Sequence, residues 1–394
     1  MSNTTEQARS ARQTLLAARA FNRRTILKSA AAAGTVTLLS PAYIQNAFAT
    51  SGELNLMFWS DELPESVLKA FTEKTGIKVN FTGFGSNEEL INKMKATNGQ
   101  GFDMVSPTLN RVLQWKDLAV TAPWDLKKVP VDKLNPAMVK AGEAWNFDGT
   151  GQHWLPHVWG TEGISWRTDL FKPAGEFPSY GDIWADANAG KTMGRASGAG
   201  SVLVGCGLWM EGEGKLPPGS MLKDAYTDEA KMKAAWDKVM EFALAHKKNI
   251  KVLWNDADAI KNGLLNEGVI VAQTWDGPPI SLKNDGQPVM YRAPKEGAMA
   301  WVDGMSLTKA AKNTDQAYAF VEFGYNPEIA GLGIQTHGYN SPVIGADKFA
   351  GDKYAKNFAD AYPGDALAKL NPWPPEPAWY VELRKQYTDK FISA

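Results

Sequence analysis

The chain has 394 residues, of which 44% are hydrophobic and 22% are charged, a composition that is typical of folded proteins and excludes a disordered chain. This length exceeds what one hydrophobic core usually serves, so the sequence predicts two lobes. The single cysteine, Cys206, excludes an internal disulfide and a multi-cysteine metal site.

The formal net charge of -1 is divided unevenly along the chain. Six basic residues against Glu6 give residues 1–49 a net charge of +5, which leaves -6 for the remainder. A mildly acidic body favours a cationic or neutral partner and argues against nucleic acid.

The N-terminal segment has the layout of a twin-arginine export signal. Arg23 and Arg24 are followed by a short apolar run at 29–39 and by a small-x-small cleavage site at 47–49. The apolar run is too short to span a bilayer. We therefore expect residues 1–49 to be a signal peptide and the mature protein to work in the periplasm.

Residues 53–81 predict a strand, a helix and a second strand. Apolar residues alternate in the first and last stretches, and between them lies a helical pattern that Pro64 opens and Gly76 closes. This order predicts a parallel βαβ unit. Trp59 and Glu62 then lie at the carboxyl end of the first strand, where open α/β sheets bind ligands.

A helix at 87–96 and a buried strand at 102–105 continue this lobe. Thr108 and Asn110 follow the strand at its carboxyl end. The Thr108 hydroxyl suits either a ligand or the cap of the next helix. An extended, proline-containing segment at 154–166 then predicts the first crossing between the lobes.

The second lobe has its own α/β pattern. A helix is predicted from Ile183 and a strand at 192–195, and a loop of small residues that includes Ser197 precedes an apolar run at Val202. Backbone N–H groups of such a loop can hold an anion, and Arg195 beside it would add charge. The loop lacks the spacing of the common nucleotide-binding motifs.

Further along, an amphipathic helix is predicted at 231–247 and a strand at 269–273. This strand would place Trp275 and Asp276 at its carboxyl end. The stretch at 294–307 then predicts the return crossing between the lobes.

In the return crossing, Trp301 and Asp303 are two residues apart in an extended segment, so we expect their side chains on one face of the strand. A cation there would meet both a π face and a counter-charge. The alternative is a core ring beside a solvated acid. A helix at 317–323, a turn that carries Tyr339 and a proline-rich tail with a last amphipathic helix follow.

Patterns for catalysis and metal binding are absent from the sequence. His153 and His157 have the spacing of a helical metal pair, but Pro156 lies between them. Neither a Gly-x-Ser-x-Gly elbow nor a pair of carboxylates with evident acid and base roles is present. Cys206 lies in an apolar run, so we expect it to be buried and inert. No cofactor is expected.

The chain resembles bacterial extracellular solute-binding proteins of the spermidine/putrescine-binding type. The resemblance rests on motifs that occur in the same order at 58–64, 71–79, 102–105, 156–163, 275–277, 294–297, 301–303 and 338–339. It implies an α/β, two-lobed periplasmic binding protein of type II, in which each lobe is a mixed sheet flanked by helices and crossing strands join the lobes. It also implies a ligand held between the lobes, a monomer without enzymatic activity, and an ABC permease of the inner membrane as partner.

The resemblance further implies which residues bind the ligand. Trp59, Trp275, Trp301 and Tyr339 match its aromatic positions, and Asp303 matches the carboxylate that pairs with a ligand amine. Rings and an acid are what a polyamine such as putrescine or spermidine needs. Several desolvated cation–π contacts of about 2 kcal/mol each could supply micromolar affinity.

The departures from the family pattern leave the ligand open. Residues 195–200 replace an acidic pair of the polyamine binders, and Glu62 and Asn110 replace tyrosines. Arg195 could hold a ligand carboxylate, which would make the ligand a zwitterionic amine of the amino-acid, opine or GABA type, or it could pair with a surface acid. A periplasmic hydrolase and a sensory protein that serves a receptor are the other functions open to this scaffold.

The predicted organisation is a signal peptide at 1–49, lobe 1 at 50–157 and 303–345, lobe 2 at 158–302, and a helical tail at 346–394 packed on lobe 2. The candidate ligand-binding residues are Trp59, Glu62, Thr108, Asn110, Arg195, Ser197, Trp275, Asp276, Trp301, Asp303 and Tyr339.

Overall fold

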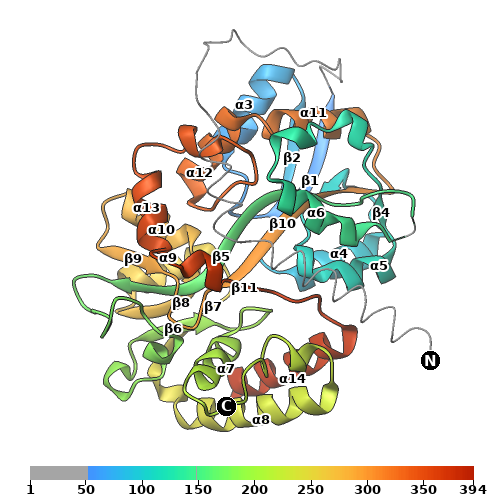
Figure 1. Cartoon of the computed structure of the whole chain (residues 1–394). Coiled ribbons are helices and arrows are strands. Elements are labelled where there is room, and N and C mark those ends of the chain that lie inside the picture. Colours follow the sequence, from blue (N-terminus) through green and yellow to red (C-terminus); the bar gives the residue numbers. More distant parts are fainter. Residues whose placement is uncertain (1–51, 148) are drawn as a thin grey trace. The chain divides into compact units, whose positions relative to one another are not determined.

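The computed structural model describes residues 52–147 and 149–394, so the predicted signal peptide lies outside the described residues. The described chain is an α/β fold that divides into two compact units (Figure 1). Unit 1 contains Gly160–Trp301 and Ala355–Ala394. Unit 2 contains Val302–Tyr354 and the described part of Arg12–Trp159.

The chain passes from one unit to the other within two strands, β5 (Leu155–Arg167) and β10 (Met299–Thr308). They coincide with the two extended segments that the sequence assigns to crossings. The predicted lobe boundaries lie at 157/158 and 302/303, and the units change at 159/160 and 301/302. Within the predicted tail, residues 346–354 group with unit 2 and residues 355–394 with unit 1.

Unit 2 is built on a sheet in which β2, β1, β3 and β10 are neighbours and β4 pairs with β10. β1 is parallel to β2 and β3, whereas β10 is antiparallel to β3 and β4. Its other strands are β1 (Glu53–Trp59), β2 (Lys78–Phe84), β3 (Met104–Val105) and β4 (Thr121–Ala122). Its helices are α3 (Glu65–Thr75), α4 (Asn87–Thr97), α5 (Val112–Leu118), α6 (Pro136–Ala141), α11 (Thr314–Gly324) and α12 (Pro327–His337).

Helix α3 connects β1 to β2, so the predicted parallel βαβ unit is confirmed. The helix ends at Gly76, whose φ of 73° is a left-handed conformation that glycine adopts without steric cost. Phe71 of this helix packs edge-to-face on Phe320 of α11, with 5.1 Å between ring centroids. Burial of such rings against β1 helps to hold that strand in place.

Unit 1 is built on a second sheet, in which β5, β8, β6 and β7 are neighbours and β9 pairs with β5. β6 is parallel to β7 and β8, and β5 is antiparallel to β8 and β9. The strands are β6 (Thr192–Arg195), β7 (Ile250–Trp254), β8 (Val271–Trp275) and β9 (Val289–Arg292), and the short β11 (Asn371–Pro372) pairs with β10 at Met299 and Ala300. The helices are α7 (Val202–Gly212), α8 (Glu229–Ala245), α9 (Ala257–Asn266), α10 (Gly277–Asn284), α13 (Tyr354–Ala361) and α14 (Ala378–Ser393).

The C-terminal helix α14 packs on α8 of unit 1 (Figure 1). Tyr380 of α14 stacks on Tyr226 with 3.9 Å between ring centroids, and Tyr387 lies 5.4 Å from the ring of Trp236. Cys206 of α7 is fully buried in the same core. Burial raises the pKa of its thiol, in agreement with the prediction that this cysteine is inert.

The helix predicted from Ile183 is wrong, because residues 180–188 form two short 3-10 turns, Tyr180–Ile183 and Asp186–Asn188. Here side chains donate hydrogen bonds to backbone carbonyls that would accept from backbone N–H groups in a helix. Asn188 donates to the carbonyl of Asp182 at 2.8 Å, and Asn249 donates to the carbonyl of Ala185 at 2.9 Å. Such side-chain bonds compete with helix formation.

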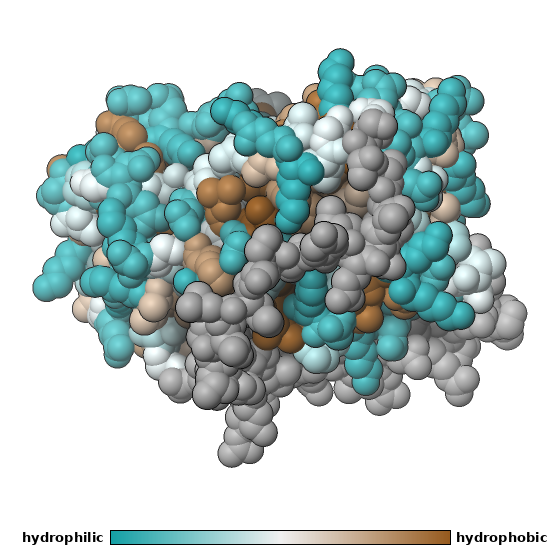
Figure 2. Space-filling model, turned by 90° about the horizontal axis from the view of Figure 1, so that it is seen from above, coloured by the Kyte–Doolittle hydropathy of each residue, from teal (hydrophilic) through white to brown (hydrophobic). Residues whose placement is uncertain are grey.

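Polar and charged residues dominate the face of the molecule shown in Figure 2, where hydrophobic residues gather only in small groups. Among residues 52–147 and 149–394, none of the helices combines the length and the apolar character that a bilayer crossing requires.

Candidate ligand-binding site

The candidate residues fall into two groups, one in each unit. Unit 2 holds Trp59, Glu62, Thr108, Asn110, Asp303 and Tyr339, and unit 1 holds Arg195, Ser197, Trp275, Asp276 and Trp301. All of them except Tyr339, which follows helix α12, belong to a strand or lie soon after one, as the sequence predicts for ligand-binding residues of an α/β fold.

A cluster of carboxyl groups is the main feature of the unit 2 group. Asp61 and Glu62 follow β1, and Asp303 belongs to β10. Glu62 is 3% exposed and Asp303 is 4% exposed, and their carboxyl groups are hydrogen-bonded to each other. Because two carboxylates cannot hydrogen-bond without a proton, the pair shares at least one.

The surroundings of this pair explain where the proton lies. Burial raises the pKa of Glu62 well above its usual value, and the charges of Asp303 and Asp61 raise it further. Burial also raises the pKa of Asp303 to about 6, although hydrogen bonds from Glu62, Thr108 and Trp59 oppose the rise. Burial and the repulsion between neighbouring acids therefore favour a shared proton over two negative charges on this pair.

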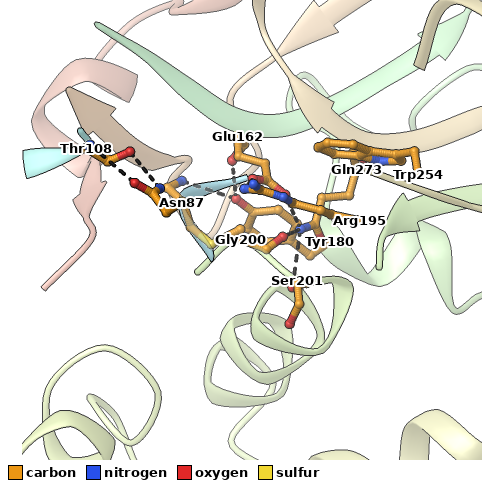
Figure 3. A network of polar contacts seen from close by, with 10 residues as sticks. Asn87, Thr108, Glu162, Tyr180, Arg195, Gly200, Ser201, Trp254 and Gln273 are labelled. Carbon is orange, nitrogen blue, oxygen red and sulfur yellow. Dashed lines mark hydrogen bonds and ion pairs between the residues drawn. The ribbon is translucent and has the colours of Figure 1, made fainter. Parts of the chain in front are cut away.

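The Oδ1 atom of Asp303 is buried and has no hydrogen-bond partner among the described residues. Thr108 lies opposite Asp303 in an antiparallel bridge, and Asn87 Nδ2 donates to Thr108 Oγ1 at 2.8 Å (Figure 3). The Thr108 side chain makes no capping bond, so the helix-cap alternative is wrong, and its hydroxyl is hydrogen-bonded to Asp303.

Two rings stand beside the acids. The Tyr339 hydroxyl donates to Asp61 Oδ2 at 2.5 Å, and the tyrosine is 2% exposed. The Trp59 ring packs on Phe84 with 4.7 Å between ring centroids. Unit 2 thus places a negative centre next to aromatic surfaces, the combination that stabilises an organic cation.

Asn110 carries an unsatisfied amide. It is 3% exposed, and neither its oxygen nor its nitrogen has a hydrogen-bond partner among the described residues. A buried polar group without a partner costs about 1–3 kcal/mol. A ligand that supplies both a donor and an acceptor would remove this cost.

In unit 1, Arg195 forms a buried ion pair with a residue that the sequence predictions missed. Its Nη1 atom lies 3.2 Å from Glu162 Oε2, and Gln273 Nε2 donates to the other oxygen of Glu162 at 2.8 Å (Figure 3). The expectation that Arg195 could pair with a surface acid is therefore wrong, because its partner Glu162 is fully buried. A glutamate among apolar residues in a crossing strand was the signal that could have identified it.

Burial also shifts the titration of Glu162. It raises the pKa of this carboxyl to about 7, although the charge of Arg195 and hydrogen bonds from Gln273 and Arg195 oppose the rise. Ser197 is half-buried in the loop that follows Arg195. Gly198 of that loop lies so close that an added Cβ would be 3.3 Å from the guanidinium carbon.

Trp301 and Asp276 meet at Gly160 of β5. An added Cβ on Gly160 would lie 2.5 Å from both Asp276 Oδ1 and the Trp301 ring. Tyr362 donates to Asp276 Oδ2 at 2.8 Å, and Thr161 Oγ1 lies 2.8 Å from the Tyr362 hydroxyl. Burial raises the pKa of Asp276 to about 7, although the hydrogen bond from Tyr362 opposes this.

Glu62 lines a small cavity of about 40 Å³ in unit 2. Two half-buried histidines, His157 and His337, share its wall with apolar side chains from α3, α11 and α12. Burial lowers the pKa of both histidines, so they are neutral at physiological pH. Within the described part of the chain, no group of three or more His, Cys, Asp or Glu side chains is arranged to hold a metal ion.

The fold is that of the periplasmic binding proteins, as the sequence predicts. A solved structure described as a putative spermidine/putrescine ABC transporter from Listeria monocytogenes has a TM-score of 0.72 and 23% identity, and the match covers 87% of this chain and 99% of that one. Residues 66–359 match the family described as bacterial extracellular solute-binding protein. The chain therefore belongs to this family of bacterial extracellular solute-binding proteins.

Curated relatives have more specific names. The spermidine/putrescine-binding periplasmic protein of Escherichia coli (strain K12) is 25% identical over 340 residues, which are 84% of this chain and 89% of that protein. The putrescine-binding periplasmic protein PotF of the same organism is 27% identical over 288 residues, which are 70% of this chain and 74% of that protein.

Proposed function

We propose that this protein is the substrate-binding component of an ABC importer and that it captures a small cationic amine in the periplasm. Polyamines such as putrescine and spermidine are the ligands that the names of the relatives suggest. The single observation that carries the proposal is the buried carboxyl pair of Glu62 and Asp303, in which Asp303 Oδ1 is left without a partner among the described residues.

An ammonium group at Asp303 would complete the hydrogen bonds of this cluster. It would donate to Asp303 Oδ1 and favour the ionised form of the acids, whose burial now favours the neutral form. Tyr339 and Trp59 would cover the methylene groups of the ligand.

The second ligand class considered from the sequence is a zwitterionic amine held by Arg195. That role requires a guanidinium that is open to a ligand carboxylate. Arg195 is already paired with Glu162 at 3.2 Å, and this pairing favours a simple cation over a zwitterion.

Calorimetry with butylamine, putrescine and spermidine tests the proposed function. Asp303→Asn is expected to weaken the best of these ligands at least about a hundredfold, because it removes the charge that faces the ammonium. Asp285→Asn is the matched control, since Asp285 is an exposed acid at the end of α10. Unchanged affinity in Asp303→Asn, or no binding by the wild type, would contradict the proposal.

We further propose that the chain is exported by the twin-arginine pathway, acts as a monomer and has no catalytic activity. Recovery of the bound amine in unchanged form separates this role from that of a periplasmic hydrolase. Co-purification with an inner-membrane permease, and not with a chemoreceptor, separates it from that of a sensory protein.

A further inference from the structure

Asn87 of unit 2 makes two hydrogen bonds to Thr108. Asn87 is the first residue of α4 and is 7% exposed, and Thr108 is 1% exposed. Asn87 Nδ2 donates to Thr108 Oγ1 at 2.8 Å, and Asn87 Oδ1 accepts from the backbone N–H of Thr108 at 3.4 Å (Figure 3). Both bonds therefore lie out of water, where a hydrogen bond is electrostatically stronger.

Other residues hold the start of α4. Ser86 caps the helix, because its Oγ atom accepts from the backbone N–H of Glu89 at 3.2 Å. Arg111 Nη1 lies 2.9 Å from Glu88 Oε1 and ties the first turn of α4 to the segment that follows β3. The helix thus has a cap and an ion pair besides the bonds of Asn87, whose side chain is available for another role.

The two bonds of Asn87 set the direction in which the Thr108 hydroxyl donates. A backbone N–H can only donate, so the end of the amide that faces it is the oxygen, and the end that faces the hydroxyl is the nitrogen. The Thr108 oxygen accepts from that nitrogen and keeps its one proton for another acceptor. This acceptor is Asp303, which lies opposite Thr108 in an antiparallel bridge and is hydrogen-bonded to its hydroxyl.

A donor directed at Asp303 affects the form of this acid. Burial raises the pKa of Asp303 to about 6, and the hydrogen bond from Thr108 opposes the rise. The bond therefore favours the ionised carboxyl group, which is the form that attracts an ammonium group most strongly. It also leaves Asp303 Oδ1, which has no hydrogen-bond partner among the described residues, as the acceptor for a ligand.

We propose that Asn87 is a positioning residue of the amine site, which directs the proton of the Thr108 hydroxyl to Asp303 and so keeps this carboxyl group as an acceptor for the ammonium group of the ligand. The inference rests on the proposed function and concerns residues of unit 2 alone. It holds for any cationic amine, because Asn87 acts on the acid and not on the ligand chain.

A comparison of two pH values isolates this effect, because the other titratable groups near Asp303 are the same in every variant. They are Asp61, Glu62, Tyr339 and, in the wall of the cavity that Glu62 lines, His157 and His337. Burial lowers the pKa of His157 to about 4 and that of His337 to about 3. Both histidines are therefore neutral at pH 6 and at pH 8, and simple amines are protonated at both values.

Asn87→Leu removes both bonds and nearly keeps the size of the side chain. The Thr108 hydroxyl is then free to turn away from Asp303, so the tightest ligand among butylamine, putrescine and spermidine is expected to bind at least about tenfold more weakly at pH 6. The loss should be smaller at pH 8, because a higher pH favours the ionised acid whether or not Thr108 donates to it. Calorimetry at the two pH values measures both losses.

A folded Asn87→Leu with the affinity of the wild type at pH 6 would overturn the inference and leave the proposed function standing. Equal losses at both pH values would also overturn it, because they would show a merely structural role. Absence of amine binding by the wild type would overturn the proposed function and the inference together.

Variants of Thr108 test whether Asn87 acts through the hydroxyl. Thr108→Val removes the hydroxyl and should show the same loss at pH 6, and the double variant N87L/T108V should bind no more weakly than Thr108→Val. Thr108→Ser keeps a hydroxyl and should bind like the wild type. Losses that multiply in the double variant, or normal binding by Thr108→Val, would contradict the inference.

Asn188→Leu is the matched control. Asn188 is also 7% exposed and donates a side-chain bond at 2.8 Å, but its acceptor is the carbonyl of Asp182 in unit 1. Its affinity for the amine should equal that of the wild type, and a loss as large as that of Asn87→Leu would count against the inference.

A circular-dichroism melting curve shows whether each variant is folded. If Asn87→Leu does not fold, Asn87→Ala takes its place, because alanine removes the same two bonds without crowding and favours the helix. The same losses at pH 6 and pH 8 are then expected of Asn87→Ala, and the same results would overturn the role of Asn87.

Discussion

Glu62 shows how burial and neighbouring acids can change the titration of a single residue. In the folded protein, burial and the neighbouring acids Asp303 and Asp61 keep the pKa of Glu62 well above its usual value. The unfolded chain releases this proton near pH 4. Between these two pKa values the folded state binds more protons than the unfolded state, so the contribution of Glu62 to stability falls as pH rises.

Glu62→Gln is expected to remove this cost, because glutamine has the shape of the neutral acid at every pH. The melting temperature of the variant should match that of the wild type near pH 4.5 and exceed it increasingly toward pH 8. Thermal unfolding of the ligand-free proteins at three pH values measures the difference. The charged groups that face Glu62 are Asp61 and Asp303, and His157 and His337 line the same cavity as Glu62.

The same pH series on Asp285→Asn provides the control, since Asp285 is exposed and belongs to neither group of candidate residues. A Glu62→Gln protein that is less stable than the wild type at pH 8 would show that Glu62 is ionised in the empty site.

At the residue scale, the sequence predicts which side chains are candidates for the site, but it does not predict which side chains are paired in the fold. Motifs and strand ends mark Trp59, Trp301 and Asp303 as candidates in the sequence. The partner of Arg195 could not be predicted, since Glu162 is 33 positions away and Gln273 is 111 positions from Glu162. Only the antiparallel pairing of β5 with β8 brings Glu162 and Gln273 together, and no local pattern encodes that register.

At the element scale, one glycine of strand β5 makes room for two of the candidate residues. Gly160 is the point where Trp301 and Asp276 approach the backbone. Gly160→Ala is expected to displace the ring or the acid, to weaken amine binding at least about tenfold and to lower stability by about 1–3 kcal/mol. Calorimetry and denaturant unfolding measure the two effects.

Gly175→Ala is the matched control in the same unit, because an added Cβ there meets no atom within 4 Å. Full affinity in Gly160→Ala would mean that neither Trp301 nor Asp276 contributes to the ligand contact.

The bounds of elements with a strongly periodic pattern of hydrophobic residues could be predicted to within a few residues. The helix expected at 231–247 is α8 (Glu229–Ala245), and the strand expected at 192–195 is β6. The 3-10 turns at 180–188 could not be predicted. Hydrogen bonds from the side chains of Asn188 and Asn249 fix the backbone there, and Asn249 lies more than sixty positions away along the chain. Period and propensity describe local preference, and a distant side chain can override it.

At the scale of the whole chain, export remains a prediction from Arg23 and Arg24, which lie outside the described residues. Replacing both by lysine keeps the charge and removes the motif. The variant is expected to stay in the cytoplasm with its signal peptide uncleaved, as cell fractionation and the mass of the protein would show. Normal export of the double-lysine variant would exclude the twin-arginine pathway.

The buried state of Cys206 has a practical consequence. The chain has one cysteine, and this thiol is fully enclosed in unit 1 with a raised pKa. A cysteine placed on the surface would therefore be the one thiol that reacts with a maleimide dye under native conditions. The natural sequence can thus carry a single fluorescent label near Asp303 or Arg195 and report ligand capture directly, with no prior removal of native thiols.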